Sequence, residues 1–437
     1  MTNCTSSSID FPACRKRHVE ADFSGGDISS NAGVLLLRQA DRLSGLTASV
    51  ARRLSDERQK GKVEHPFAAL LRQRVYALAL GYEDVNDHEG LRRDLALQTA
   101  VERDRPLASP STLSRFENAA DRAWAWSTNE ALVENFIASH SQPPEELILD
   151  FDATDDAVHG RQVGRFFHGY YDHYCFLPLY GFCGDHLLFS YLRPSNKDGA
   201  KHAWAILSLL VKRLRQAWPE VRIIFRGDSG FCRHKMLGWC ERHDVGYIVG
   251  LAKNARLNDL AAPWMAAAAN DFEAGGVKQR RFGEFTYAAT TWMIERRVIA
   301  RIEHGRKGAN PRYIVTNLEG EAQELYDKLY CQRGNMENRI KEQQLDLFAD
   351  RTSCHGWWAN QFRLLLSSIA YTLIETIRRC GLAGSDMARA QAGTIRLKLL
   401  KIGAVIVRNT RRLRFHLSSA CPDKALFRLA AERLTPE

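Results

Sequence analysis

Apolar and polar positions divide the chain into a helical first part and a mixed second part. Residues 1–140 carry apolar side chains at helical spacing, which predicts several amphipathic helices. From residue 147 short apolar runs, typical of buried strands, alternate with helical segments. The expected order is three strands, a helix, a strand, a helix and a strand, which indicates an α/β fold.

Later segments complete this pattern. The helix between the third and fourth expected strands is capped near Asp198. Residues 270–316 alternate as an antiparallel insertion would, and residues 322–344 predict one long helix. Residues 141–146 are rich in proline and acid and predict a linker between the two parts.

A short helix is predicted near the end of the first part. Ser109 is its expected N-cap and Pro110 its first residue, with Arg115 pointing outward. Such a helix can read a DNA groove, and it can equally serve only to pack against its neighbours.

Two carboxylates end the first expected strand. Residues 147–149 are apolar, and Asp150 and Asp152 continue the strand on one face. Carboxylates at such a place cost desolvation energy unless a positive group lies beside them. A divalent metal ion or a helix N-terminus would meet that need.

Three acids stand out by position. Asp152 ends the first strand, Asp228 ends the fourth, and Glu337 lies in the long helix after the insertion. Strands one and four can be neighbours in such a sheet, and a returning helix can bring the third acid across them. Oxygen ligands favour Mg²⁺, with Mn²⁺ as a substitute. Two such ions about 4 Å apart activate water and stabilise a leaving oxygen at phosphorus.

One face of the long helix also carries groups that bind phosphate. Tyr330, Arg333, Glu337 and Lys341 follow each other at steps of three, four and four residues. Arginine grips phosphate at two points, whereas tyrosine and lysine contact it at one. The stripe is therefore either a phosphate clamp around a metal-binding acid or a surface ladder of salt bridges.

Composition excludes several classes of protein. The 437 residues suggest two or three domains, and no run of about 18 apolar residues predicts a membrane span. The N-terminal residues lack the apolar region of a secretory signal. Ten scattered cysteines, including Cys232 and Cys240 around one predicted helix, are expected to be reduced thiols in a cytoplasm.

Positive charge is concentrated near the C-terminus. The formal net charge is +10, and residues 338–437 hold 17 Lys and Arg against 8 Asp and Glu. No acid occurs between Asp386 and Asp423. A solvated surface normally mixes signs, so this stretch indicates binding of a polyanion such as nucleic acid. The arginines expected to contact DNA are Arg408, Arg411, Arg412 and Arg414.

These residues resemble those of a known family. Asp152, Asp228 and Glu337 resemble the DDE triad of bacterial insertion-sequence transposases with a ribonuclease-H-like core. Tyr330 and Arg333 together with Glu337 match the Y-R-E signature of the IS-four-like group. The segments DFDATDD, FRGDSGF, LASPSTLSRFEN and NMENRIKE resemble insertion-sequence family thirteen-eighty, from about residue 25 to the C-terminus.

The resemblance implies cut-and-paste transposition. A metal-activated water would cut each transposon end, and the freed 3′-hydroxyl would attack target DNA at the same site. Terminal inverted repeats and target DNA are the implied partners, held by a homodimer in a synaptic complex at the bacterial nucleoid. The implied parts are a helical DNA-binding domain, a ribonuclease-H-like core with a mixed sheet in two parts, a β-rich insertion, and a basic C-terminal helical region for DNA binding or dimerisation. They span residues 1–140, 147–269 with 317–380, 270–316 and 381–437.

Single residues differ in how well they match. The D-x-T context favours Asp152 over Asp150 as first ligand, and Asp155 and Asp156 are expected in a turn or cap. The signature expects lysine where Gln344 stands, so Lys341, one turn earlier, is its expected substitute.

An insertion-domain tryptophan is also implied by the resemblance. Trp292 would stack on an unpaired base, although a tryptophan within a core strand is the simpler interpretation.

Three other functions compete with transposition. A nuclease on the same fold would cut DNA without joining it. A DNA-binding protein descended from a transposase would lack one of the acids. A zinc enzyme could use His168, His173 and Cys175, but a fourth ligand is missing from that region.

Overall fold

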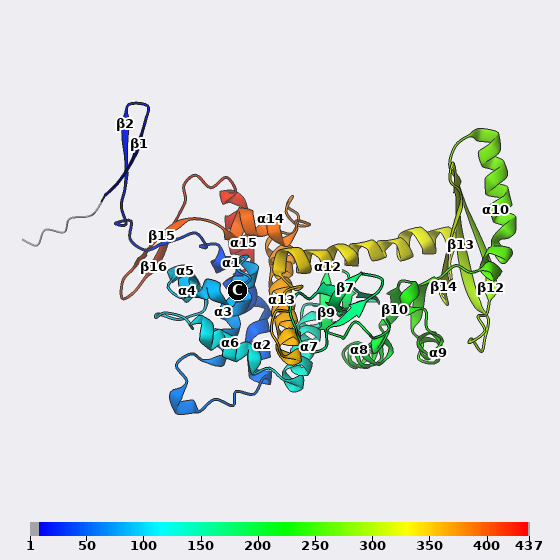
Figure 1. Cartoon of the computed structure of the whole chain (residues 1–437), viewed down its shortest axis with the longest axis horizontal. Helices are drawn as coiled ribbons and strands as arrows, with labels where there is room; N and C mark the ends of the chain where they lie inside the picture. Colours follow the sequence, from blue (N-terminus) through cyan, green and yellow to red (C-terminus); the bar gives the residue numbers. More distant parts are fainter. Residues whose placement is uncertain (1–7, 436–437) are drawn as a thin grey trace, which may run out of the picture. The chain divides into compact units, whose positions relative to one another are not determined.

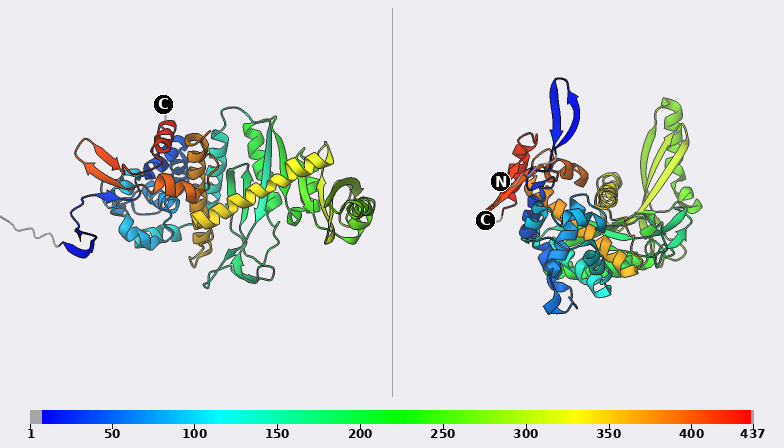
Figure 2. Two further views of the ribbon diagram at one scale, coloured as in Figure 1. Left: turned by 90° about the horizontal axis from the view of Figure 1, so that it is seen from above. Right: turned by 60° about the vertical axis from the view of Figure 1, so that its left-hand side comes forward.

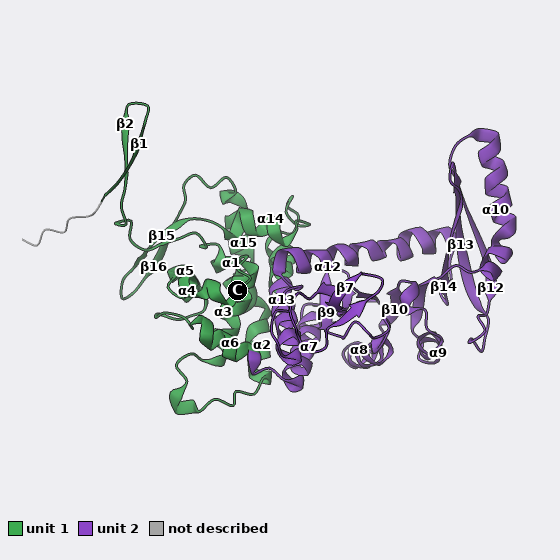
Figure 3. Ribbon diagram, in the orientation of Figure 1, with its two compact units in different colours: residues 1–117, 373–437 green, residues 118–372 purple. Residues whose placement is uncertain are grey.

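The structure is a computed structural model that describes residues 8–435, drawn with its element labels in Figure 1 and from two other sides in Figure 2. The chain forms two compact units, coloured separately in Figure 3. Unit 1 comprises residues 1–117 and 373–437, and unit 2 comprises residues 118–372. The ends of the chain therefore share a unit, and the finer domain boundaries stay a prediction.

A mixed eight-stranded sheet forms the centre of unit 2. Its order is β12-β13-β14-β11-β10-β4-β8-β9, in which β4, β10 and β11 are parallel and the remaining pairs antiparallel. The strands are β4 (Glu146–Ala153), β8 (Leu179–Cys183), β9 (His186–Tyr191), β10 (Arg222–Gly227), β11 (Gly246–Leu251), β12 (Gln279–Tyr287), β13 (Arg296–Gly305) and β14 (Gly308–Thr316). The predicted α/β class is confirmed, as is the adjacency of the first and fourth strands, β4 and β10.

Helices cover both faces of this sheet. They are α7 (Arg122–Ala138), α8 (Ala203–Ala217), α9 (His234–Arg242), α10 (Ala255–Gly275), α11 (Ala322–Glu324), α12 (Gly334–Leu347) and α13 (Trp357–Thr376). One face packs Leu149, Phe151 and Phe225 in a core with residues of α8 and α9. The opposite face packs Ile224 against Tyr326 of the helical segment that precedes α12.

The expected antiparallel insertion continues the main sheet. β14 pairs with β11 from Ile248↔Thr316 to Leu251↔Tyr313, so strands β12–β14 extend the sheet beyond β11. The helix α10 packs on these strands, and its Trp264 occupies the space that a Cβ on Gly283 would need. The right-hand view of Figure 2 shows α10 beside these strands.

Three predictions about local structure in unit 2 were wrong. The helix after β9 begins at Ala203 rather than near Asp198, because the Arg193 guanidinium fixes residues 199–201 as a loop. Residues 165–194 form four strands, β6 to β9, where two were expected. A small separate sheet has the order β5 (Asp156–Ala157), β7 (His173–Phe176) and β6 (Phe166–His168), so Asp156, expected in a turn or cap, is a buried strand residue.

The predicted long helix is helical throughout but irregular. α11 runs into a π-helical segment at Leu325–Tyr330 and a 3₁₀ turn at Cys331–Arg333, which lead into α12. Such bulges shift the angular position of side chains, so a purely α-helical spacing does not hold before Gly334.

Unit 1 combines helices with short strands. Its helices are α1 (Val34–Ser44), α2 (Leu46–Arg53), α3 (Phe67–Ala79), α4 (His88–Leu91), α5 (Leu95–Ala100), α6 (Pro110–Asn118), α14 (Ala392–Ile395) and α15 (Lys424–Arg433). Its strands are β1 (Ile9–Cys14), β2 (Arg17–Ala21), β3 (Ile28–Ser29), β15 (Ala404–Arg408) and β16 (Leu413–Leu417). α6 begins at Pro110, as predicted.

The basic C-terminal region corrects one expectation. The arginines expected to contact DNA lie on and between β15 and β16, which form an antiparallel hairpin rather than a helix. Val405, Ile406 and Val407 favour this extended structure because they are β-branched. Helices flank the hairpin, and β3 pairs with β15 through Ala404↔Ser29.

Candidate active site

Strand register brings the first two predicted acids together. β4 and β10 are parallel and pair Ile148 with Ile224, and the last pair along them is Phe151 with Gly227. Asp152 and Asp228 each follow that last pair by one residue. Because side chains alternate along a strand, both lie on the face opposite the Phe151 and Phe225 core.

Asp228 also caps the turn that follows β10. Its carboxylate accepts a hydrogen bond from the backbone N–H of Gly230 at 2.8 Å, at the start of the 3₁₀ turn Ser229–Phe231. The hydrogen bond at the start of this turn therefore holds the Asp228 carboxylate in place. A single hydrogen bond still leaves other carboxylate lone pairs available to a second partner.

Arg333 connects the third acid to the first. Its Nη1 lies 3.3 Å from Oδ2 of Asp152, and its Nη2 lies 2.5 Å from Oε1 of Glu337 in the first turn of α12. The guanidinium thus stands between the carboxylate of β4 and that of the crossing helix. The structure therefore brings Asp152 and Glu337 to the two Nη atoms of one guanidinium group.

The pKa of Asp152 also reflects the proximity of the other two acids and Arg333. Burial raises the pKa of Asp152 to about 7, against the lowering effect of Arg333, and the charges of Asp228 and Glu337 raise it further. Burial lowers the pKa of Arg333, but Asp152 and Glu337 outweigh this effect, so that its pKa rises overall. Like charges at one point favour binding of a cation.

Asp150 has a different partner. Its carboxylate forms a buried two-point ion pair with Arg226, whose Nη2 lies 2.6 Å from Oδ2. Burial raises the pKa of Asp150, against the lowering effect of Arg226. Arg226 was not recognised in the sequence, although its position two residues before Asp228 places it on the same face as Asp150 and Asp152.

Tyr330 lies beside Asp228. Burial raises the pKa of Tyr330 to about 12, which Arg333 opposes, and the charge of Asp228 contributes to the rise. Its hydroxyl would lie 2.6 Å from a Cβ on Gly250, so the close approach requires glycine at that position of β11. Tyr330, Arg333 and Glu337 are thus near neighbours despite the irregular helix.

The signature position Gln344 has a structural role. Its amide donates to the backbone carbonyl of Asp155 at 2.9 Å and to Oδ1 of Asp156 at 3.1 Å. It therefore holds the segment that follows Asp152. Lys341, the expected substitute for the signature lysine, is exposed on α12, and its role stays a prediction.

Trp292 lies in the loop between β12 and β13, not within a strand. It is half-buried, stacks under the Arg296 guanidinium at 4.9 Å from the ring centre, and contacts Tyr287 edge to face at 5.6 Å. The interpretation as a strand residue was wrong, because the chain leaves β12 at Tyr287. Its contact with a DNA base stays a prediction.

The residues of unit 1 expected to contact DNA are all exposed. Arg115 is on α6, and Arg408, Arg411, Arg412 and Arg414 are on the β15–β16 hairpin. The carboxamide oxygen of Asn409 accepts hydrogen bonds from the backbone N–H groups of Arg411 and Arg412, at 3.0 and 2.9 Å. This fixes the turn that presents the two arginines.

The structure gives no support to a zinc site at the small sheet. Cys175 is fully buried, and Nε2 of His173 binds Oδ2 of Asp155 at 2.8 Å. No disulfide links the nine cysteines that the structure describes, in agreement with the predicted reduced thiols.

The most closely spaced group of possible metal ligands lies outside the candidate active site. Within residues 8–435, the one group of His, Cys, Asp and Glu whose ligating atoms all lie within 4.8 Å is Asp10, His18 and Glu20, all exposed. The three candidate catalytic acids are farther apart than that, with Arg333 between two of them. Their donor chemistry nevertheless fits Mg²⁺ or Mn²⁺, because it consists of carboxylate oxygens with shared negative charge.

A mixed sheet with acids at the ends of adjacent parallel strands, and a third acid on a crossing helix, is the arrangement expected of a DDE transposase. The chain belongs to that family: the model of the transposase DDE domain group 1 matches residues 11–437. DDE transposases use divalent metal ions and act on DNA.

The structural comparison shows a more distant similarity than the family match. A solved structure of the piggyBac transposase synaptic complex with hairpin DNA is similar, with 10% identity and a TM-score of 0.40. The similarity covers 84% of this chain and 79% of that chain. No curated protein matches the sequence. Within residues 8–435, no helix has the length and apolar character needed to cross a membrane.

Proposed function

We propose that this protein catalyses cut-and-paste transposition of an insertion sequence, by DNA cleavage followed by strand transfer. Membership of the DDE transposase family supports this proposal, and the juxtaposition of Asp152 and Asp228 by strand register carries it. We assign it to the IS-four-like group and to insertion-sequence family thirteen-eighty on the resemblance of its motifs.

Asp152, Asp228 and Glu337 are the proposed metal ligands and catalytic residues. Two Mg²⁺ ions, when bound, would supply a nucleophilic water and charge stabilisation at the scissile phosphate. The partly buried side chain of Asp152 is best ionised when positive charge is near, which Arg333 provides at 3.3 Å. Asp228 is held in place by its hydrogen bond from Gly230.

The residues around the acids would orient the DNA strand. Arg333 can exchange its contacts with Asp152 and Glu337 for a two-point contact with phosphate. Tyr330 presents its hydroxyl beside Asp228, and Lys341 offers a single positive charge one turn beyond Glu337. Together they would position the scissile bond rather than bind metal.

DNA would be held over a larger surface than the active site. In unit 1 the exposed hairpin arginines and Arg115 supply positive charge for binding phosphate. In unit 2 the strands β12–β14, with Trp292 at one end, would lie along the transposon end. Because both ends must be cut together, we propose a homodimer in the synaptic complex, working on DNA at the bacterial nucleoid.

The decisive experiment is cleavage of DNA that carries the inverted repeats flanking the gene. Asp228→Asn keeps the shape of the side chain but loses its charge, so cleavage with Mg²⁺ or Mn²⁺ should disappear while DNA binding persists. Asp244→Asn, at an exposed site in the loop between α9 and β11, serves as the control. Normal cleavage by Asp228→Asn would refute the proposed metal site.

Joined products separate transposition from its alternatives. A transposase joins the cut end to target DNA, whereas a nuclease on the same fold releases the cut end unjoined. A catalytically idle descendant would bind the repeats and cut nothing. All three acids are present in this chain, which favours the active enzyme.

A further inference from the structure

A hairpin beside the candidate active site exposes an unusual number of aromatic side chains. It comprises residues 165–174, with β6 and β7 paired from Phe166↔Cys175 to His168↔His173. Tyr170 at its turn is 85% exposed, Phe167 53% and Tyr174 47%. Large apolar side chains gathered on one exposed element mark an interaction surface.

The hairpin is firmly attached at its base. The hydroxyl of Ser195 donates to the backbone carbonyl of Phe166 at 2.8 Å, and β7 pairs with β5 through Asp156↔Phe176. At its turn, the backbone N–H of Asp172 donates to the carbonyl of His168 at 2.8 Å. The exposed rings therefore belong to an ordered element, and their exposure is not the result of a loose loop.

Its rings form a continuous series that leads toward the acids. Tyr170 contacts Tyr171 edge to face at 5.0 Å, and Tyr171 lies 4.9 Å from the ring of His168. Burial raises the pKa of Tyr171 to about 12, and the charges of Asp155 and Asp152 contribute to the rise. The inner end of the series thus lies in electrostatic reach of Asp152, while Tyr170 faces solvent.

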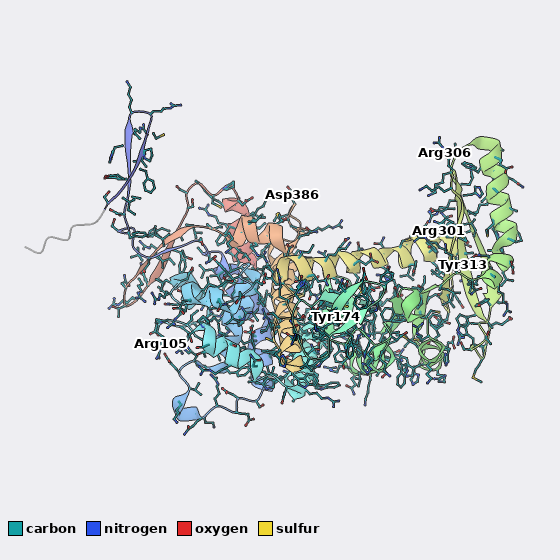
Figure 4. The ribbon with its side chains drawn as sticks, viewed as in Figure 1. Arg105, Tyr174, Arg301, Arg306, Tyr313 and Asp386 are labelled. Carbon is teal, nitrogen blue, oxygen red and sulfur yellow. The ribbon has the colours of Figure 1, made fainter. Side chains whose placement is uncertain are left out.

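Positive charge lies beside the ring pair Phe167–Tyr174, on the other face of the hairpin from His168. The Arg165 guanidinium lies over the Tyr174 ring at 4.5 Å from its centre, and Arg161 is exposed just before the hairpin. Figure 4 labels Tyr174 on β7. Arginine beside exposed aromatic rings is the combination that binds single strands, because bases stack on the rings while phosphates contact the cations.

We propose that the hairpin of residues 165–174 is a stacking platform for unpaired bases of the DNA strand that enters or leaves the active site. The inference rests on the proposed function and deepens it, because it assigns the single-stranded part of the substrate to a particular surface. The hairpin is better suited to this than Trp292, whose ring is half-buried beneath Arg296. Tyr170 and Phe167 are the residues that would contact bases.

The test compares two DNAs without divalent metal, so that catalysis plays no part. One is a labelled duplex, and the other is the same duplex with a short single-stranded thymine extension. Tyr170→Ala and Phe167→Ala should each weaken binding of the extended DNA at least about fivefold, whereas binding of the blunt duplex should change less than about twofold. Tyr170→Trp should bind the extended DNA as tightly as the unaltered protein does, because tryptophan also provides a stacking ring.

The matched control is Trp204→Ala, which removes a 48% exposed aromatic side chain from α8 in the same unit. It should leave both affinities unchanged. The slope of affinity against salt should also stay the same for Tyr170→Ala, because stacking releases no counterions. Thermal unfolding of each variant checks that the fold is retained.

Several outcomes would overturn the proposal. These are equal losses of affinity for both DNAs, an unchanged affinity for the extended DNA, or a change of oligomeric state in Tyr170→Ala that identifies the hairpin as a protein interface. If the unaltered protein binds neither DNA, the proposed function itself fails. Binding of both DNAs with no selective loss refutes the platform alone.

Discussion

Asp150 and Arg226 form a buried ion pair on the face of the sheet that leads to Asp152. Asp152 lies two residues further along β4, on the same face, yet its cation is Arg333 of the crossing helix, which is shared with Glu337. Neighbouring carboxylates of one strand therefore have separate tasks. Asp150 is paired with Arg226 within the sheet, and Asp152 is the proposed metal ligand.

Asp150→Asn should consequently reduce the stability of the protein, whereas Asp152→Asn should reduce its cleavage activity. Asp150→Asn leaves the Arg226 guanidinium buried without its carboxylate, which should lower the free energy of unfolding by about 3–5 kcal/mol. Asp152→Asn removes a partly buried charge that Asp228 and Glu337 repel, so stability should be retained while cleavage is lost. Urea unfolding measures the stability of both variants, and single-turnover assays measure their cleavage rates. If only Asp150→Asn loses cleavage per folded molecule, Asp150 is the first metal ligand.

Removal of Arg333 tests the proposed phosphate clamp. Arg333→Ala should reduce single-turnover cleavage roughly 100-fold, because a displacement of about 1 Å of the scissile bond has an effect of that size. The affinity for Mn²⁺ should change little, because Arg333 both competes with metal for Asp152 and Glu337 and helps to keep Asp152 ionised. Lys341→Ala, on the exposed part of α12, should have the weaker effect.

The opposite pattern would change the assignment. If Arg333→Ala loses stability but cleaves normally per folded molecule, the arginine belongs to a structural salt-bridge ladder. If Mn²⁺ affinity falls together with cleavage, Arg333 holds the carboxylates in the geometry that metal needs. Isothermal titration with Mn²⁺ and urea unfolding separate these cases.

Much of the catalytic core follows from local pattern. Apolar runs that end in Asp152 and Asp228 predicted two strands whose ends meet at one edge of the sheet. The parallel pairing of β4 with β10 agrees with this prediction. Arg226 was missed because its partner depends on strand register, which the sequence does not state. The π-helical and 3₁₀ turns before α12 were missed for a similar reason: tertiary contacts of Tyr326 and Tyr330 decide them, not helix propensity.

The regions outside the core depended more on tertiary context. The aromatic segment after Asp152 has strand composition, but nothing local distinguishes a small separate sheet from strands of the main sheet. In the basic region, the β-branched residues 405–407 favour a strand, whereas the pattern of charges carries no information on secondary structure. The position of Gln344 was recognised as a departure from the signature, whereas its contacts with Asp155 and Asp156 required the fold.

Neutralising the hairpin arginines should weaken DNA binding and flatten its dependence on salt. Replacement of Arg408, Arg411, Arg412 and Arg414 by glutamine removes exposed charges from β15, β16 and their turn. Every phosphate that an arginine no longer neutralises should reduce the slope of log affinity against log salt by about 0.9. Fluorescence anisotropy over a range of salt concentrations measures the slope.

The control for this experiment replaces four other exposed or half-exposed cations of unit 1. These are Arg52, Arg53, Lys60 and Lys62. Their removal changes the net charge equally but should leave the slope nearly unchanged if DNA is held by the hairpin alone. Equal effects of the two quadruple variants would show that only net charge matters and that the hairpin has no special role.

Asp156 offers a test of stability against pH. Its side chain is fully buried, Oδ1 accepts from Gln344, and Oδ2 has no hydrogen-bond partner within residues 8–435. Burial raises the pKa of Asp156 well above its usual value of 3.8, and the charges of Asp350 and Asp155 raise it further. The folded protein therefore keeps a proton on Asp156 at pH values where the unfolded chain has released it.

The sign of the effect follows from this proton. Stability from the protonated carboxyl is fully present below the unfolded pKa of about 3.9 and falls by about 1.4 kcal/mol per pH unit until the pH reaches the folded pKa. Asp156→Asn keeps an acceptor for Gln344 but cannot ionise, so it should be more stable than the unaltered protein near pH 8 and gain less near pH 5. Urea unfolding at both pH values measures the gain, with Asp386→Asn as the exposed control. A difference that does not change with pH would mean that Asp156 is ionised in the folded protein and has a positive partner.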